Sequence, residues 1–221
     1  MFESETMSRL RGKNGVRFFG DIHGCHAEFA ALAADALERN LHLHSLGDLI
    51  NRGPDSPSCM LLACDLYDSG WLDLNPGNHD ERFLRWFKGE KVPIKPNGLG
   101  STLAQLESVA DRETLIRRYA DLMLRAPLWS RFGRIYSVHA ALHAEMIGHS
   151  VASTDGLRER RNEAGGRIVH LDTGLQRSGR LSYIDVPMPV IECRDEPAIE
   201  AFPQVSDVEI RVTRAEKHRH T

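Results

Sequence analysis

The 221-residue chain has few of the features that mark secreted or membrane-bound proteins. It has only four cysteines, and Cys25, Cys59, Cys64 and Cys193 form neither a CxxC pair nor the spacing of a disulfide framework. No apolar run approaches the roughly 20 residues that cross a bilayer, and the polar start of the chain lacks the pattern of a secretory signal. We therefore expect reduced thiols, a cytoplasmic location and no membrane partner.

Neither sign of charge dominates. The chain carries 28 basic and 31 acidic residues, a formal net charge of −3, which argues against a broad basic face and a nucleic-acid partner. Its 41% hydrophobic and 27% charged residues are ordinary for a globular protein. We expect a single domain over residues 1–221, with frayed termini at about 1–14 and 214–221. No oligomeric state follows from the composition.

The pattern of apolar residues predicts an α/β fold. In the first half, three strand-like runs alternate with two helical patterns, at residues 16–19, 26–40, 41–46, 57–67 and 71–74. This alternation predicts parallel strands joined by helical crossovers. Residues 80–125 are mostly helical around a loop at 93–100, and the later strand-like runs lie at 128–132, 134–138, 167–171, 181–186 and 208–212. We predict two packed mixed sheets flanked by helices.

Each of the first three predicted strands ends in a glycine turn with potential metal ligands. The turns read GDIHG at 20–24, GDLINRG at 47–53 and GNHD at 77–80. Ligands of open α/β sheets bind beyond the carboxyl ends of the strands, so we expect the turns to converge on one crevice. A lone Asp after a strand is often only a helix cap, but three successive turns indicate a metal site. Their imidazoles favour Mn, Fe or Zn over Mg or Ca.

These residues resemble the calcineurin-like metallophosphoesterases and, within them, the phosphoprotein phosphatase family. The three turns match the family motifs GDxHG, GDxxDRG and GNHE, while VHAAL at 138–142 and GHS at 148–150 resemble its two later histidine motifs. Residues 170–186 are similar to the closing segment of bacterial members. The resemblance spans roughly residues 16–186 and implies the αββα sandwich of that family.

The resemblance also implies a site with two divalent metal ions as cofactors, Mn in the first place and Fe or Zn as alternatives. One ion would be held by Asp21, His23 and Asp48. The carboxylate of Asp48 would bridge to the second ion, whose other ligands would be Asn78, His139 and His149. Two such ions can share a water molecule and lower its pKa, so that it attacks phosphorus directly.

Three side chains would then act on the substrate. By the resemblance, Arg52 would bind the phosphate through its guanidinium group, beside Asn78 and His79. His79 would donate a proton to the leaving oxygen. Together with Asp48, the side chains of Arg52 and His79 form the predicted catalytic set.

One departure from the family pattern concerns the substrate. Asn51 stands where the protein phosphatases have an aspartate that orients the acid histidine and stabilises its charged form. An amide cannot stabilise an imidazolium with a full charge. Symmetrical diadenosine tetraphosphatases also lack that aspartate and also have the sequence GNHD, so Asn51 and Asp80 favour a nucleotide substrate.

Two further departures concern the second half of the site. His139 and His149 are only ten positions apart, where the family has a longer crossover, and parallel strands need about a dozen connecting residues. His143 and His170 are therefore alternatives to His149 as the last ligand. No arginine lies between the two histidine motifs, and the candidates for a second phosphate-binding arginine are Arg158, Arg160, Arg161 and Arg167.

Three hypotheses follow for function. The main one is a metal-dependent phosphomonoesterase, a serine/threonine protein phosphatase, whose partner is a phosphoprotein or a small phosphorylated substrate. The alternative is a symmetrical diadenosine tetraphosphatase or another nucleotide phosphoesterase. The second alternative is a binding module that keeps the phosphatase fold without catalysis.

Overall fold

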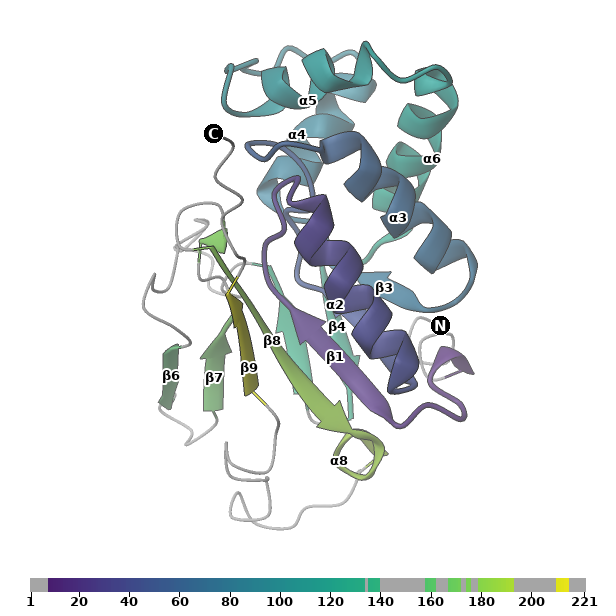
Figure 1. Ribbon diagram of the computed structural model, residues 1–221, viewed down its shortest axis with the longest axis vertical. Helices are drawn as coiled ribbons and strands as arrows, with labels where there is room; N and C mark the ends of the chain where they lie inside the picture. The colour runs from purple at the N-terminus through teal and green to yellow at the C-terminus, as the bar shows by residue number, and fades with distance from the viewer. Residues whose placement is uncertain are drawn as a thin grey trace.

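The computed structural model describes residues 8–133, 135–139, 158–161, 167–171, 174–175, 179–192 and 210–214. Its centre is a five-stranded mixed sheet in the order β3-β2-β1-β8-β9 (Figure 1). The first half of the chain alternates strands and helices as predicted: β1 (Gly15–Phe19), α2 (His26–Glu38), β2 (Leu41–Ser45), α3 (Ser56–Asp68) and β3 (Leu72–Leu74).

The parallel half of the sheet confirms the prediction from alternation. β1 pairs in parallel with β2, and β2 with β3. Helix α2 buries Phe29, Leu32, Ala33 and Ala36, whose spacing of three and four residues places them on one side of the helix. Together, α2 and α3 cover one face of these strands (Figure 1).

The end of the chain corrects the predicted division into two sheets. β8 (Arg180–Pro187) pairs antiparallel with β1, and β9 (Ile210–Arg214) pairs antiparallel with β8, so both strands extend the first sheet. A buried ion pair strengthens the β1–β8 contact, because Arg17 donates through Nε and Nη2 to the two carboxylate oxygens of Asp185 at 2.6 and 2.8 Å. Alternating hydropathy identifies such strands but does not tell which neighbour they join.

The opposite face of the sheet meets β4 (Trp129–Phe132) and β5 (Ile135–Val138), which form an antiparallel pair. The ring of Phe132 packs edge-to-face against Phe18 of β1, with ring centroids 5.1 Å apart. A second antiparallel pair consists of β6 (Arg158–Arg161) and β7 (Arg167–His170), and β6 is a strand that the charged sequence did not predict. The described residues thus give an α/β fold with a mixed sheet flanked by helices, while the later strands outside that sheet form two separate pairs.

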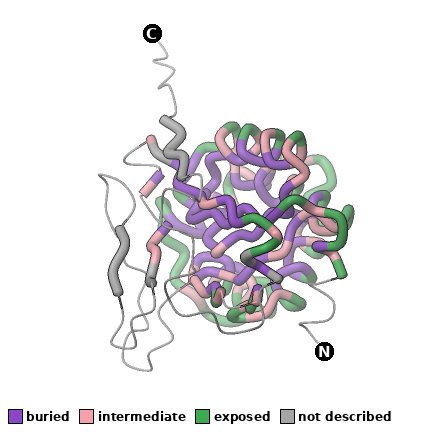
Figure 2. Tube along the Cα trace, turned by 90° about the horizontal axis from the view of Figure 1, so that it is seen from below, coloured by how far each residue is buried: buried purple, intermediate pink, exposed green. Residues whose placement is uncertain are grey.

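Three helices follow β3: α4 (Asn78–Phe87), α5 (Leu99–Leu106) and α6 (Arg112–Arg125). They lie beyond the carboxyl ends of β1, β2 and β3 (Figure 1). A short helix, α8 (Met188–Glu192), follows β8. Within the described residues, the buried segments lie toward the inside of the molecule and the outward-facing sides of the helices are exposed (Figure 2). Among the described residues, no helix combines the length and apolarity needed to span a membrane.

Candidate metal centre

The glycine turns after β1 and β2 are tied together by their backbones. The N–H groups of Ile22 and His23 both donate to the carbonyl oxygen of Asp48, at 3.2 and 2.8 Å, and Gly24 N–H donates to Leu49 O at 2.8 Å. The predicted convergence of these two turns is therefore built into the main chain. Local strain accompanies it: His23, Asp48, Asn51 and Arg52 all have positive φ, between 49° and 73°. Such conformations are costly for residues other than glycine and gather at functional sites.

Asp80 joins the third turn to the second. One oxygen of its carboxylate accepts from Asp48 N–H at 2.7 Å and from Gly77 N–H at 2.9 Å. The other accepts the hydroxyl of Tyr119 at 2.8 Å. At Gly77 any Cβ atom would collide with the carboxylate of Asp48, so only glycine permits this approach. The final Asp of GNHD is thus a structural residue that fixes the site.

We call Asp21, His23, Asp48, Asn78 and His139 the Asp48 cluster. The buried carboxylate of Asp48 lies at its centre, with Oδ2 3.7 Å from His23 Nε2 and Oδ1 3.7 Å from His139 Nε2. On one side, Asp21 Oδ2 lies 3.2 Å from His23 Nε2. On the other, Asn78 Oδ1 lies 3.2 Å from His139 Nε2. The structure therefore brings five of the six predicted ligands together in the two groups predicted for two ions.

Both histidines of the Asp48 cluster turn the same nitrogen toward it. His23 Nδ1 lies 3.2 Å from the carbonyl oxygen of Ile50, and His139 Nδ1 lies 2.7 Å from that of Leu46. A carbonyl oxygen only accepts, so Nδ1 carries a proton in both rings, and in the neutral ring Nε2 would offer its lone pair to a metal ion. This anchoring of one ring nitrogen is the usual arrangement of metal-binding histidines.

The electrostatics of the Asp48 cluster favour a cation. Burial first, and then the neighbouring carboxylate of Asp21, raise the pKa of Asp48 to about 7. Burial lowers the pKa of His139, but the carboxylates of Asp48 and Asp21 outweigh it, so that pKa is raised. Carboxylate, imidazole and amide ligands of this kind fit divalent transition metals. The donor set therefore fits the predicted metal ions.

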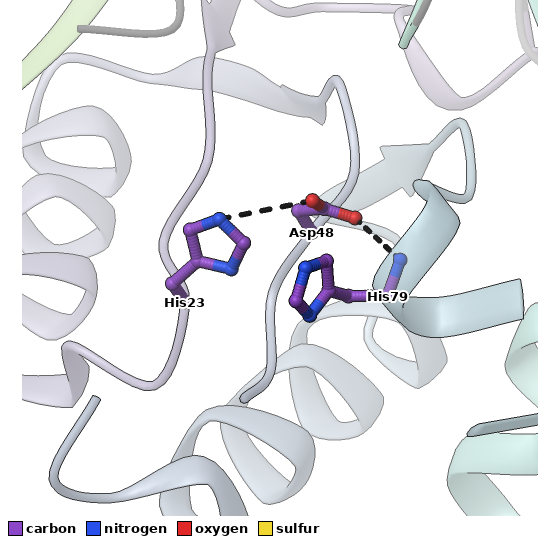
Figure 3. Close-up of side chains that lie close together, drawn as sticks. All are labelled: His23, Asp48 and His79. Carbon is purple, nitrogen blue, oxygen red and sulfur yellow. Dashed lines mark hydrogen bonds and ion pairs between the residues drawn. The ribbon is translucent and has the colours of Figure 1, made fainter. Parts of the chain in front are cut away.

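A further histidine, His79, lies beside His23 and Asp48 (Figure 3). His23, Asp48 and His79 offer ligand atoms within 4.8 Å of one another. The backbone N–H of His79 donates to Asp48 Oδ1 at 2.8 Å, and the rings of His23 and His79 are 4.8 Å apart. The ring of His79 differs from the other two, because its Nδ1 lies 2.9 Å from Asn51 Nδ2 instead of a carbonyl oxygen.

Arg52 is exposed at the edge of the cluster, and its Nη1 lies 2.8 Å from His23 Nε2. This position suits a group that meets an incoming phosphate. His149 and its alternative His143 lie outside the described residues, and His170 is the last residue of β7. The side chains of the candidates for a second arginine, Arg158, Arg160, Arg161 and Arg167, also lie outside the described part of the structure.

Helix α5 supplies positioning residues that the motif analysis missed. Ser101 Oγ accepts from Arg52 N–H at 3.2 Å, and Thr102 donates to Asn51 Oδ1 at 2.8 Å. Gln105 donates to Gly53 O and accepts from Ser56 N–H, at 2.9 and 2.8 Å. These three side chains lie about fifty positions from the turn they hold, so no spacing in the sequence connects them to it.

A family model described as calcineurin-like phosphoesterase matches residues 16–175. The chain belongs to this family. Its membership confirms the predicted resemblance at the level of the metallophosphoesterases. The fold of this phosphoesterase is also similar to a crystal structure of a protein provisionally called a diadenosine tetraphosphatase, with a TM-score of 0.53, 21% identity and 93% and 96% of the two chains covered.

Curated relatives of this phosphoesterase carry tetraphosphatase names. The asymmetrical bis(5'-nucleosyl)-tetraphosphatase PrpE of Geobacillus thermodenitrificans is 31% identical over 147 residues, 60% of each chain. The enzyme of the same name from Bacillus velezensis is 34% identical over 142 residues, 58% of this chain and 57% of the relative. The symmetrical bis(5'-nucleosyl)-tetraphosphatase of Chromohalobacter salexigens is 39% identical over 129 residues, 56% and 43%. The phosphoesterase thus spans about 60% or less of the length of these relatives.

Proposed function

We propose that this phosphoesterase hydrolyses dinucleoside polyphosphates at the Asp48 cluster with two divalent metal ions. The observation that carries the reaction class is the two-sided donor set, in which the two oxygens of Asp48 face His23 and His139 at 3.7 Å. A module that only binds a partner has no need to gather buried carboxylates in this way. When bound, divalent ions supply positive charge that lowers the pKa of water and balances charge on phosphoryl oxygens.

The chain's own residues supply the remaining steps. Asp21, His23, Asn78 and His139 would hold the ions around Asp48. The exposed guanidinium of Arg52, held at its backbone by Ser101, binds the phosphate that is transferred to water. His79 lies buried beside Asp48 and directs its ring to the leaving oxygen.

The substrate class rests on the relatives. The curated relatives compared above are bis(5'-nucleosyl)-tetraphosphatases at about 30 to 40% identity, which favours the nucleotide alternative over the main prediction of a serine/threonine protein phosphatase. Asn51, in place of the aspartate expected for a protein phosphatase, supports the same choice. Cytoplasmic location, which suits a soluble nucleotide, is part of this proposal.

The test is a comparison of substrates on one preparation. Protein loaded with Mn²⁺ is assayed with diadenosine tetraphosphate and with a phosphoserine peptide. We expect kcat/KM to be at least tenfold higher for the nucleotide, and the products (two ADP, or ATP with AMP) to show which bond breaks. Faster turnover of the phosphopeptide would favour a protein phosphatase instead. Absence of activity on both substrates would reject the proposal that the protein is a catalyst. The Asp48→Asn variant is the blank for contaminating hydrolases.

A further inference from the structure

A buried chain of polar groups runs from α3 and α5 to the ring of His79. The hydroxyl oxygens of Ser56 and Thr102 lie 2.9 Å apart, Thr102 donates to Asn51 Oδ1 at 2.8 Å, and Asn51 Nδ2 lies 2.9 Å from His79 Nδ1. Ser56, Thr102 and Asn51 are fully buried, and His79 is 4% exposed. Water therefore has little access to these groups, and each depends on its protein partners.

The direction of these hydrogen bonds fixes the proton on His79. Because the hydroxyl of Thr102 donates to the carbonyl oxygen of Asn51, the amide NH₂ group of Asn51 faces the ring. An NH₂ group donates, so Nδ1 of His79 accepts. A neutral imidazole has one donor nitrogen and one acceptor nitrogen, which leaves the ring proton of His79 on Nε2.

This polarity is the opposite of that in the two histidines of the Asp48 cluster. His23 and His139 donate from Nδ1 to backbone carbonyls, which leaves Nε2 as the lone-pair nitrogen of the neutral ring. His79 accepts at Nδ1 and presents an N–H group at Nε2. The site thus contains two rings arranged as metal ligands and one arranged as a hydrogen-bond donor.

We propose that Asn51 and Thr102 are positioning residues that hold His79 as an Nε2–H donor, and that they thereby match the site to leaving groups already stable as anions. The naming of a nucleotide as the substrate rests on the proposed function; the orientation of the ring does not. In the reaction, a bond forms between the water oxygen and phosphorus, and the bond from phosphorus to the bridging oxygen breaks. The leaving phosphate keeps the electron pair, and the proton lost by the attacking water passes to solvent.

The leaving group decides whether a hydrogen bond is enough. A departing phosphate is stable as an anion, so His79 can keep its proton and stabilise the developing charge by hydrogen bonding alone. A departing serine side chain is a strongly basic alkoxide, which needs a full proton from the acid. A carboxylate at position 51 would accept from Nδ1–H and stabilise the doubly protonated ring, which could then give up a full proton from Nε2.

The ring of His79 can be observed directly. In ¹⁵N-histidine-labelled protein loaded with Zn²⁺, the two nitrogens of a neutral ring have well-separated ¹⁵N shifts, and a His79→Gln variant assigns the signal. We expect the N–H nitrogen of His79 to be Nε2. Thr102→Val removes the hydroxyl that fixes the Asn51 amide, so the amide can rotate by 180° and both tautomers of His79 should be populated. Thr102→Ser keeps a hydroxyl at this position and should retain the Nε2–H tautomer. An N–H at Nδ1 in the unaltered protein would overturn the proposal.

Selectivity gives the second readout. Unaltered protein and Asn51→Asp are compared on aryl phosphates of graded leaving-group acidity and on diadenosine tetraphosphate. We expect Asn51→Asp to raise kcat/KM for phenyl phosphate relative to p-nitrophenyl phosphate at least tenfold. Thr114→Val, the Thr102 substitution transferred to an exposed threonine of α6, should change neither readout.

The outcomes separate this proposal from the proposed function. An unchanged ratio in Asn51→Asp would overturn the role of Asn51, whatever the natural substrate is. A protein that shows the Nε2–H ring and the expected ratio, but leaves diadenosine tetraphosphate intact, would support the positioning role and reject the nucleotide substrate.

Discussion

Two buried groups of histidines and acids lie on the same sheet, and they are built in opposite ways. The Asp48 cluster lies beyond the carboxyl ends of β1, β2 and β3. The other group, which we call the His44 network, lies between β2, β3 and β5 and consists of Arg9, His42, His44, Asp73, Asn75 and Ser137. Composition alone does not distinguish the two groups, since both combine imidazoles with acidic or amide side chains.

In the His44 network every oxygen acceptor has a protein donor nearby. The Asp73 carboxylate lies 3.1 Å from His42 Nε2 and 3.2 Å from Arg9 Nη1. Burial raises the pKa of Asp73, but these partners, His42 first, more than offset it, so that pKa is lowered. Asn75 Oδ1 lies 3.0 Å from His44 Nε2 and accepts from Ser137 at 2.9 Å.

In the Asp48 cluster the acids face each other. Asp21 and Asp48 lie on the same side of His23, and burial together with Asp21 raises the pKa of Asp48 to about 7. Burial and the mutual repulsion of these carboxylates thus disfavour their charged forms, and a bound cation would favour them. The electrostatic environment of the acids, more than residue type, therefore distinguishes a binding site from a structural network.

The largest expected effect is that of Asp48→Asn. Loss of the central carboxylate of the Asp48 cluster should lower kcat/KM by about 10³-fold or more, several kcal/mol of transition-state stabilisation. The metal-free variant should be at least as stable to urea as unaltered protein, because an amide removes a buried charge and can still accept from His79 N–H. Strong destabilisation of the metal-free variant would show that the carboxylate of Asp48 stabilises the fold, as that of Asp73 does in the His44 network, and would contradict the account.

The next effect is a pH dependence of stability from His44. Burial lowers the pKa of His44 from 6.5 to about 4, so between these pH values the unfolded chain binds a proton that the folded protein does not. Stability conferred by the neutral ring is therefore full above pH 6.5 and is lost as the pH falls to about 4, by about 3 kcal/mol.

Urea unfolding of metal-free protein across this pH range measures the effect. His44→Asn should flatten the slope of unfolding free energy against pH, whereas His26→Asn, at a half-buried position on α2, should leave it unchanged. Equal slopes in the unaltered protein and His44→Asn would show that His44 is not held neutral by the fold.

The smallest effect is that of Ser137→Ala. The hydroxyl of Ser137 joins His44 Nε2 at 2.8 Å and Asn75 Oδ1 at 2.9 Å, and its loss should cost about 1 kcal/mol of unfolding free energy. Activity per folded molecule should fall less than tenfold, since His139 keeps its own anchor on Leu46. Ser108→Ala, which removes an exposed hydroxyl, is the matched control. An activity loss as large as that of Asp48→Asn would place Ser137 in the site.

The sequence predicted the Asp48 cluster because its ligands follow strands directly. Asp21, Asp48 and Asn78 each lie within four residues of a strand end, so parallel pairing alone brings them together. The pattern of apolar residues had already located the first three strands to within two residues. Nothing local, however, identified the partners of β8, because Arg17 and Asp185 are 168 positions apart.

The positioning residues were beyond prediction for a related reason. Thr102 and Tyr119 act on the site through side-chain hydrogen bonds from helices α5 and α6. Their places in those helices follow ordinary amphipathic patterns, which reveal burial but not the identity of the buried partner. The His44 network could not be predicted either, because the sequence LHLHS has the alternating pattern of an ordinary strand and does not indicate what its histidines contact.

A crystal of the protein soaked in Mn²⁺ and measured at the manganese absorption edge tests the central claim most directly. Two anomalous peaks should flank the carboxylate of Asp48, one beside Asp21 and His23 and the other beside Asn78 and His139. No peak at Asp48, or manganese bound instead between His42 and Asp73, would contradict the account.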